Sequence, residues 1–383
     1  MLLQVYLHFP FCKRKCLYCD FCSAAENAQT VAAYCLRLKD NLFTIGEKYA
    51  DAQVKTIFLG GGTPSLVPAD EMAGVLDALR QSFQILTDAE FTSEANPGTL
   101  TREWLDMAVS HGLNRLSIGV QAAQDELLQR IGRIHTFREA QEAVKLARGA
   151  GVRNINLDAM FGLPGQTKQD YLNTLDAFAE LGVEHISAYS LILEEGTPLH
   201  AQAEMGQVSL PDEDEVAEMY EAGIEKLQRL GYERYEVSNF ARPGYACKHN
   251  IGYWQGAWYL GLGAAAHSML PPTPEQRRQG AVRVRVANTT DVQAYIKEEN
   301  HQETELILPQ EAMFESLMLG LRTTMGVSEK LLEDQHGVSL RAGYGARLET
   351  LVRDGLAQWK DGCFALTPRG IEVQNEVLMR LMD

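Results

Sequence analysis

The chain of 383 residues is long enough for one large α/β domain and a smaller second one, and 45% of its residues are hydrophobic. Its 35 Lys and Arg against 51 Asp and Glu give a net charge of −16, which argues against a nucleic-acid-binding protein and against attachment to anionic lipids by charge alone. Seven cysteines, four of them crowded into one stretch, do not suit a secreted disulfide framework and favour a reducing cytoplasm.

The N-terminal segment and six β-rich runs set the expected framework. MLLQVYLHFP lacks a basic segment and continues into cysteines, so we do not expect a signal peptide. No run approaches the ~18 apolar residues of a membrane helix. Helical segments such as EMAGVLDALRQSF alternate with the β-rich runs, which predicts a parallel sheet. The runs span residues 3–9, 54–60, 89–95, 114–120, 153–162 and 184–193.

Unusual residues stand at the C-terminal ends of these runs. Cysteines follow the first run, GGGTP (60–64) follows the second, and EANP (94–97) ends the third. GVQ (119–121) ends the fourth run, and Asp158 lies late in the fifth. Strand ends that converge on one mouth are how a (β/α) barrel builds its site. The sequence therefore predicts a partial, open (β/α)6 barrel of the TIM type rather than a doubly wound sheet.

A smaller unit is expected at the C-terminus. AVRVRVAN (281–288) alternates like an exposed or edge strand, and three short helices then precede a hairpin with Asp361-Gly362 as its turn. This order is typical of a winged helix. Eight Lys and Arg against eleven Asp and Glu give the last 75 residues a net charge of −3, which favours protein contact over DNA. We expect a core domain over 1–270, a connecting segment over 271–308 and a C-terminal domain over 309–383.

The stretch HFPFCKRKCLYCDFC holds Cys12, Cys16, Cys19 and Cys22, spaced C-x3-C-x2-C-x2-C. Soft thiolates at such spacing select zinc, copper(I) or an iron–sulfur cluster. Three cysteines can bind three irons of a [4Fe–4S] cube and leave the fourth iron open. A structural zinc bound by all four cysteines is the alternative, although such sites usually separate two C-x2-C pairs by a longer loop.

The cysteine stretch and four later motifs together resemble one known family. YLHFPFCKRKCLYC, with Tyr18 as its aromatic residue, resembles the signature of the radical S-adenosylmethionine (SAM) superfamily, and GGGTPS, EANPGT, SIGVQ and DAMFGLPGQT follow in that family's order. Over essentially its whole length, the chain is similar to the branch of oxygen-independent coproporphyrinogen III oxidase and the haem chaperone HemW. The resemblance implies that Cys12, Cys16 and Cys19 bind the cluster and that SAM chelates its open iron.

The resemblance also implies which residues contact SAM. Gly61, Gly62 and Thr63 match the loop that faces its methionyl part, since glycine lets a backbone come close to a ligand. Glu94 matches a carboxylate that accepts hydrogen bonds from SAM hydroxyls or its amine. The further positions that the resemblance places around SAM are Tyr6, Gln121, Arg133 and Asp158. Taken singly, Tyr6 could be an ordinary aromatic residue of a strand, Arg133 a solvated charge on a helix, and Asp158 a buried cap.

A second motif, CKHNIGYW, matches the H-N-x-x-Y-W sequence of the haem chaperone branch. An imidazole can bind haem iron axially and aromatic faces can cover a porphyrin. We therefore expect His249 as the iron ligand and Tyr253 and Trp254 as walls of a haem site. A histidine packed beside aromatic residues is the structural alternative.

Other residues could also take part in haem binding. Cys247 and His267 are rival iron ligands. Arg283 and Arg285 of VRVRV could pair with haem propionates, because a guanidinium binds a carboxylate through two hydrogen bonds.

The resemblance implies two possible functions, a haem chaperone that delivers haem b to client haemoproteins and a coproporphyrinogen III oxidase. The winged-helix pattern adds a third, a cluster-sensing regulator. The oxidase carries an extra cysteine two residues after the third ligand, where this chain has Phe21, so Cys22 is expected to be a structural or spare thiol. We expect no extra segment before the first strand, such as the oxidase carries, which also favours the chaperone. The acidic charge of the winged-helix region disfavours the regulator. The chaperone reading implies a cytoplasmic homodimer that meets respiratory clients at the inner face of the membrane.

Overall fold

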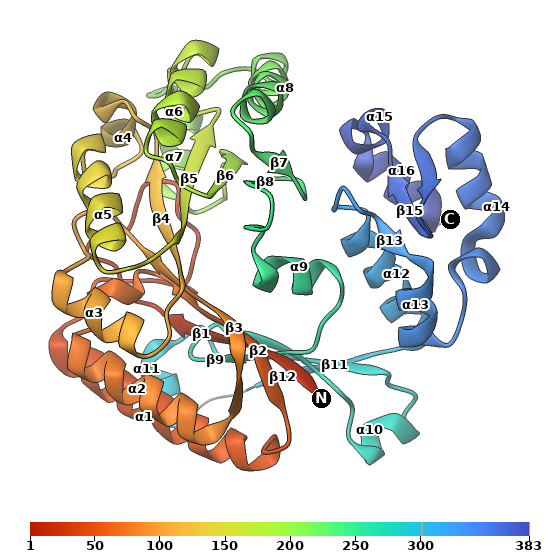
Figure 1. Cartoon of the computed structure of the whole chain (residues 1–383), viewed down its shortest axis with the longest axis horizontal. Coiled ribbons are helices and arrows are strands. Elements are labelled where there is room, and N and C mark those ends of the chain that lie inside the picture. The colour runs from red at the N-terminus through yellow and green to blue at the C-terminus, as the bar shows by residue number, and fades with distance from the viewer. Residues whose placement is uncertain (300–301, 383) are drawn as a thin grey trace.

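The computed structural model describes residues 1–299 and 302–382, so Asn300 and His301 of the predicted connecting segment and the terminal Asp383 lie outside the description. A curved sheet with helices on its outer side forms the larger part of the molecule, and a smaller C-terminal unit stands beside it (Figure 1). In the described part of the chain, no helix is both long and apolar enough to cross a lipid bilayer.

The six predicted runs form neighbouring parallel strands. They are β1 (Leu2–Phe9), β2 (Gln53–Gly61), β3 (Gln84–Ala95), β4 (Arg115–Gln121), β5 (Asn154–Phe161) and β6 (His185–Ser190). Each strand pairs with the next along the chain, so all six carboxyl ends lie at one edge of the sheet. Every residue of β4 is buried, as expected for a strand covered on both faces. The predicted parallel sheet of a partial barrel is confirmed.

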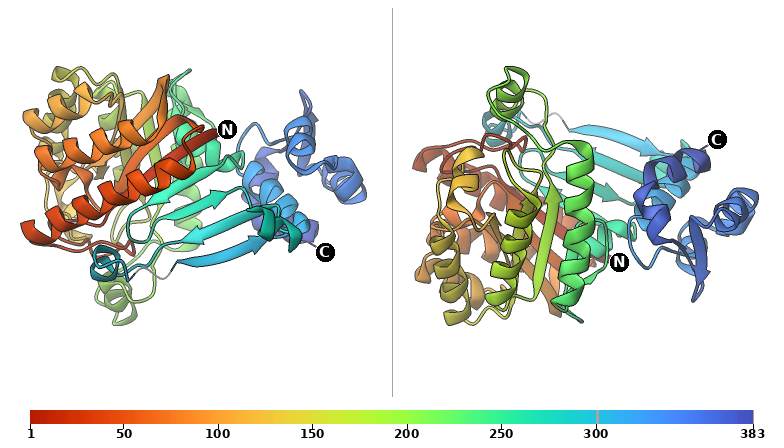
Figure 2. Two further views of the ribbon diagram at one scale, coloured as in Figure 1. Left: turned by 90° about the horizontal axis from the view of Figure 1, so that it is seen from below. Right: turned by 90° about the horizontal axis from the view of Figure 1, so that it is seen from above.

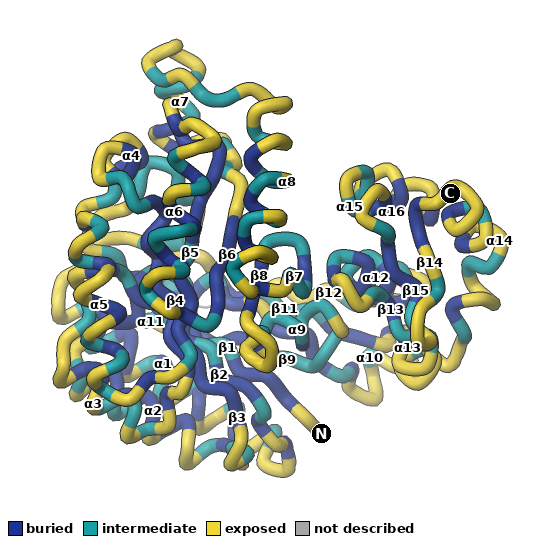
Figure 3. Tube along the Cα trace, turned by 45° about the horizontal axis from the view of Figure 1, so that its top comes forward, coloured by how far each residue is buried: buried dark blue, intermediate teal, exposed yellow. Residues whose placement is uncertain are grey.

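Helices cover the outer face of these strands. They are α1 (Ala28–Lys48), η1 (Pro64–Leu66), α2 (Ala69–Ser82), α3 (Arg102–Ser110), α4 (Asp125–Arg130), α5 (Phe137–Gly149) and α6 (Lys168–Glu180). Local sequence signals start several of them: the Thr136 hydroxyl accepts from the Glu139 N–H, and the Glu139 carboxylate accepts in return from the Thr136 N–H. Figure 3 shows the result, with buried strands inside and exposed helix faces outside.

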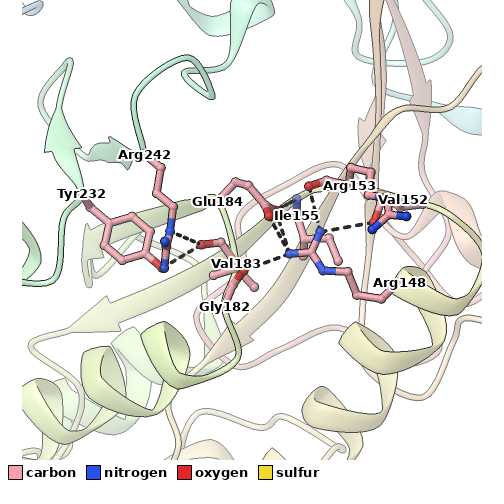
Figure 4. A network of polar contacts seen from close by, with 9 residues as sticks. All are labelled: Arg148, Val152, Arg153, Ile155, Gly182, Val183, Glu184, Tyr232 and Arg242. Atoms are coloured by element: carbon pink, nitrogen blue, oxygen red, sulfur yellow. Dashed lines mark hydrogen bonds and ion pairs between the residues drawn. The ribbon is translucent and has the colours of Figure 1, made fainter.

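A polar network fixes the N-terminal ends of β5 and β6, opposite the mouth (Figure 4). Arg148, in the last turn of α5, donates to both carboxylate oxygens of Glu184 at 2.8 Å. It also donates to the carbonyl oxygens of Arg153 at 2.8 Å and Gly182 at 3.0 Å. Glu184 in turn accepts from the Ile155 N–H at 3.0 Å. One guanidinium therefore ties α5 to the starts of two core strands.

Replacing Arg148 by alanine should destabilise the fold by about 1–3 kcal/mol, because the mostly buried Glu184 carboxylate loses its charged partner. The free energy of unfolding from urea titration measures this cost. The matched control is Arg102→Ala, which removes a solvent-exposed pair with Asp106 and should cost at most about 0.5 kcal/mol. Equal costs for both variants would contradict the structural role of the network.

Further strands lengthen the sheet on both sides, making twelve within the described residues. β9 (Tyr259–Leu262) runs parallel to β1, and β10 (His267–Leu270), β11 (Arg283–Ala287) and β12 (Glu303–Ile307) continue antiparallel. The outermost strand is β12; β11, where the sequence predicts an exposed or edge strand, is paired on both sides. β8 (Asn239–Ala241) and β7 (Glu233–Arg234) follow β6. The accompanying helices are α7 (Pro198–Glu204), α8 (Glu213–Arg229), α9 (Lys248–Trp254), α10 (Pro274–Arg278) and α11 (Val292–Ile296).

The C-terminal unit has its own apolar core, and strands β10 to β12 reach toward it in Figure 2. Three helices and a hairpin appear as expected, and Asp361 and Gly362 adopt positive φ angles of 51° and 76° in the predicted turn. The final two helices were not predicted. The elements are α12 (Pro309–Gly320), β13 (Val327–Ser328), α13 (Glu329–His336), α14 (Leu340–Arg353), β14 (Ala357–Lys360), β15 (Cys363–Leu366), α15 (Pro368–Glu372) and α16 (Gln374–Met382).

Candidate functional site

Two adjoining cavities open where the parallel strands end. We call them the cysteine cavity, with a volume of about 160 Å³, and the wide cavity, with a volume of about 940 Å³. Gly61 and Glu94 line both of them. The other predicted residues in the cysteine cavity are Cys12, Cys16, Tyr18, Cys19, Gly62, Thr63, Gln121, Arg133 and Asp158. Those in the wide cavity are Tyr6, Tyr253, His267, Arg283 and Arg285, together with Cys22.

The cysteine-bearing segment is a loop closed at its base. The Cys12 N–H donates to the Ala24 carbonyl at 2.9 Å, so the two ends of the segment lie next to each other. Cys12, Cys16 and Cys19 are half-buried free thiols that line the cysteine cavity. Cys22 lines the wide cavity instead, where its thiol donates to the Thr290 carbonyl at 3.1 Å. The loop therefore separates the fourth cysteine from the other three.

A chain of polar contacts links two of these thiols. The Cys12 sulfur lies 3.7 Å from the Thr63 hydroxyl oxygen, which accepts from the Asn96 amide at 2.7 Å. The Asn96 oxygen accepts from Arg133 at 2.5 Å, and Arg133 donates to the Cys16 sulfur at 3.4 Å. The thiols and the guanidinium thus belong to one connected set of polar contacts in the cysteine cavity. Asn96 belongs to the EANP stretch, but sequence reasoning missed it as an individual site residue.

The donor set suits an iron–sulfur cube. Among the described residues, no three His, Cys, Asp or Glu side chains form a group that could hold one metal ion. A cube of four irons is larger than one ion and offers each thiolate its own iron, so its ligands need not meet at a point. Three thiols in one cavity, with Arg133 to balance negative charge, fit such a cluster.

The glycines of GGGTP serve the packing of the cysteine loop. A Cβ atom on Gly62 would stand 2.5 Å from the Phe11 carbonyl oxygen, and one on Gly61 would stand 2.4 Å from the His8 ring. Gly61 also has a φ of +106°, which glycine adopts without strain. The sequence predicts close approach to a ligand here, and the structure adds close approach to the chain's own backbone.

Glu94 sits between the two cavities in an unusual electrostatic position. Burial and the neighbouring charge of Asp158 raise the pKa of Glu94 to about 8, although it accepts a hydrogen bond from the Gly61 N–H at 3.1 Å. Burial also raises the pKa of Asp158, which accepts from Asn156 at 2.7 Å. Paired carboxyl groups of this kind bind a cation or hydroxyl groups more readily than an anion.

Gln121, Arg133 and Tyr18 complete the wall of the cysteine cavity. Gln121 is buried at the end of β4 with a positive φ of 80°, a strained backbone conformation of the kind that gathers at functional sites. Arg133 donates to the Gly119 carbonyl as well as to Asn96 and Cys16. Burial raises the pKa of Tyr18. Tyr6, by contrast, lines the wide cavity, where its hydroxyl lies 3.1 Å from His8 Nδ1.

The H-N-x-x-Y-W motif forms helix α9, and its histidine is enclosed. His249 is 1% exposed, and its Nδ1 lies 2.8 Å from the Thr56 hydroxyl. Its Nε2 lies 3.0 Å from the Tyr253 hydroxyl. Both ring nitrogens are thus hydrogen-bonded inside the protein, and burial lowers the pKa of the imidazole to about 3. Binding of haem iron by His249, as the motif predicts, would therefore require one of these two hydrogen bonds to break.

Two other expected haem contacts face elsewhere. Cys247 is fully buried and its thiol donates to Glu90 at 3.4 Å, so it lines neither cavity. Trp254 packs near the C-terminal unit, where Arg322 lies 6.0 Å from its ring. Tyr253 alone of the motif reaches the wide cavity.

The two arginines of β11 line the wide cavity but already have partners. Arg285 donates to Glu305 at 2.6 Å and to Glu315 at 2.5 Å. Arg283 is buried, donates to Gln335 at 3.2 Å and lies over the Trp258 ring at 5.5 Å. The expected pairing with propionates would require these contacts to break.

Comparison with known proteins agrees with the fold and the motifs. Residues 6–178 match the radical SAM superfamily, and residues 307–373 match the HemN C-terminal domain. The heme chaperone HemW of Bacillus subtilis is 36% identical over 380 residues, covering 98% of this chain and 97% of that protein. The protein of that name from Lactococcus lactis is 33% identical over 382 residues, with 99% and 97% covered.

A solved structure shares the architecture. Coproporphyrinogen III oxidase (HemN) from Escherichia coli, a radical SAM enzyme, superposes with a TM-score of 0.82 over 99% of this chain and 89% of that chain, at 21% identity. At that identity the likeness concerns the fold alone. The HemW relatives, by contrast, exceed 30% identity over nearly the full chain, and with the cysteine loop and strand-end motifs in place, this chain belongs to the HemW family of the radical SAM superfamily.

Proposed function

We propose that the protein binds haem b and delivers it to client haemoproteins. The observation that carries the proposal is the wide cavity of about 940 Å³, which adjoins the cysteine cavity. Its volume lies at the upper end of the ~300–1,000 Å³ typical of small-molecule sites, as a flat tetrapyrrole would need. The names of the HemW relatives, heme chaperones, support haem as the cargo.

In this proposal the cysteine cavity holds a [4Fe–4S] cluster and SAM. Cys12, Cys16 and Cys19 would bind three irons, and Glu94 and the Gly61–Thr63 loop would hold SAM at the strand ends. When bound, a cluster and SAM together supply radical chemistry. The residues of the chain orient the two groups, and Arg133 balances the charge of the thiolates.

The wider arrangement follows the same proposal. We place the protein in the cytoplasm as a homodimer that meets respiratory clients at the inner face of the cell membrane, with the acidic C-terminal unit as the contact surface. We also propose the division into a core over 1–270, a connecting segment over 271–308 and a C-terminal domain over 309–383.

Haem transfer tests the proposed function directly. Haem-loaded protein is mixed with an apo-haemoprotein, and the Soret band reports haem on each partner. We expect transfer to the apo-haemoprotein and no conversion of coproporphyrinogen III when that compound is offered anaerobically with SAM and a reductant. Conversion of coproporphyrinogen III would instead show that the protein is an oxidase. Failure of the protein to bind any haem would exclude the chaperone function.

A further inference from the structure

The wide cavity is built by segments that are distant in the sequence. Strands β9 to β11 give one wall and α12 gives another, with Met318 and Leu319 facing inward. Tyr253 of α9, the cysteine loop and the ends of the core strands, with Tyr6, Gly61 and Glu94, line the remaining sides. The sheet extension and the C-terminal unit both supply lining residues and therefore enclose a space that the core strands alone would leave open.

One face of the sheet extension supplies a row of side chains to this cavity. Met269 of β10 lies opposite Tyr259 of β9 and opposite Arg285 of β11, so these three share a face. His267 precedes Met269 by two residues and therefore points to the same side. A thioether and an aromatic ring form an apolar patch next to an imidazole, a combination that suits a flat, largely apolar ligand with a metal at its centre.

His267 differs from the other imidazole in the cavity. His8 is 6% exposed, its Nδ1 lies 3.1 Å from the Tyr6 hydroxyl, and its Nε2 lies 3.0 Å from the Cys22 carbonyl oxygen. The His267 side chain is exposed and, within the described residues, its imidazole makes no hydrogen bond or ion pair. A ring nitrogen that is free and accessible can bind a metal without breaking an existing contact.

The positively charged side chains of the wide cavity also differ in whether they already have partners. Arg285 is neutralised by two glutamates, and Arg283 is buried against Trp258. Lys15, on the loop between Cys12 and Cys16, is exposed at the border of the two cavities and forms no ion pair in the part of the chain that is described. It is the cation available to an anionic group at the rim.

We infer that the wide cavity is the haem site, that His267 binds the haem iron, and that Lys15 pairs with a propionate. Tyr253, Tyr259 and Met269 form the apolar wall beside the iron ligand. This inference rests on the proposed function, because it takes haem as the cargo. Binding through one exposed histidine at an open rim leaves the haem accessible to a receiving protein, as delivery requires.

The inference also gives His249 a different task. Gln4 donates to the Thr56 hydroxyl at 3.0 Å, so the Thr56 proton is directed to Nδ1 of His249, 2.8 Å away. Nε2 then carries the proton and donates to the Tyr253 hydroxyl at 3.0 Å. His249 is thus a positioning residue that holds Tyr253 against Tyr259, whose ring centroid lies 4.7 Å away.

Haem titration of the full-length protein, followed by absorption spectroscopy, tests the ligand. His267→Ala should shift the Soret band and weaken haem binding at least about tenfold, and added imidazole should restore the parent spectrum. The variant should fold, because His267 is exposed. His200→Ala on α7, a histidine outside the wide cavity, is the matched control and should behave like the parent.

Two more variants separate the roles. Lys15→Gln should lower haem affinity about two- to fivefold, more at low salt, while leaving the spectrum unchanged. His249→Phe should keep the parent's Soret position. If the parent binds no haem, the proposed function itself fails. If the parent binds haem and His267→Ala keeps the parent's spectrum and affinity, the assignment of His267 as the iron ligand is wrong. If the parent spectrum is lost only in His249→Phe, the buried His249 is the iron ligand instead.

Discussion

Replacing Cys12, Cys16 or Cys19 by serine should abolish the iron–sulfur cluster, whereas Cys22→Ser should retain it. After anaerobic reconstitution we expect about four irons per chain in the parent and in Cys22→Ser, and almost none in the other three. The reason is geometric: three thiols line the cysteine cavity, while the Cys22 thiol donates to the Thr290 carbonyl in the wide cavity.

The measurement combines iron and sulfide analysis with the charge-transfer absorbance of the cluster. Cys363→Ser is the matched control, since Cys363 lies on β15 in the C-terminal unit and should not affect iron content. Cluster loss in Cys22→Ser would contradict the three-ligand arrangement. A tightly bound zinc in place of iron, lost on removing any of the four cysteines, would instead support the structural zinc site.

Glu94→Gln should weaken SAM binding about 10- to 100-fold while leaving cluster content unchanged. The carboxylate stands where the two cavities meet, and a buried hydrogen bond to a charged group contributes about 1.5–3 kcal/mol. Calorimetric titration of the cluster-loaded protein with SAM measures the effect. Unchanged SAM affinity in the variant would remove Glu94 from the site.

The raised pKa of Glu94 adds a pH dependence with a defined sign. Folding raises this pKa from 4.5 to about 8, so the ligand-free folded chain keeps a proton that the unfolded chain has released, and stability falls as pH rises through that window. Glutamine removes this cost. The ligand-free variant should therefore be at least as stable as the parent at pH 8, which distinguishes a lost contact from a damaged fold. SAM affinity of the parent should rise as the carboxyl ionises toward pH 8 and above, and that of the variant should lack this rise.

The H-N-x-x-Y-W motif shows what could not be predicted from the sequence. HNIGYW was recognisable as a string, and an imidazole beside aromatic rings suggested an iron ligand. The partner that occupies His249 is Thr56 of β2, 193 residues earlier in the chain. No local pattern contains such a contact, because it exists only once α9 packs against the strand. The sequence offers His267 as a rival iron ligand, but the accessible position of its side chain beside Met269 depends on the pairing of β9, β10 and β11.

By itself the sequence determined the parallel strands, the helices between them, the crowded cysteines and the family resemblance. These depend on residue spacing within short segments: alternation with the period of a strand or a helix, and motifs at strand ends that a parallel sheet must bring to one edge. Only the tertiary structure decided that the Cys22 thiol lies in the wide cavity against Thr290, that Glu94 is buried near Asp158, and that the sheet extension and α12 enclose the wide cavity. The physical reason is that burial, electrostatic neighbours and cavity walls arise from residues far apart in the chain, whose meeting depends on packing rather than on local pattern.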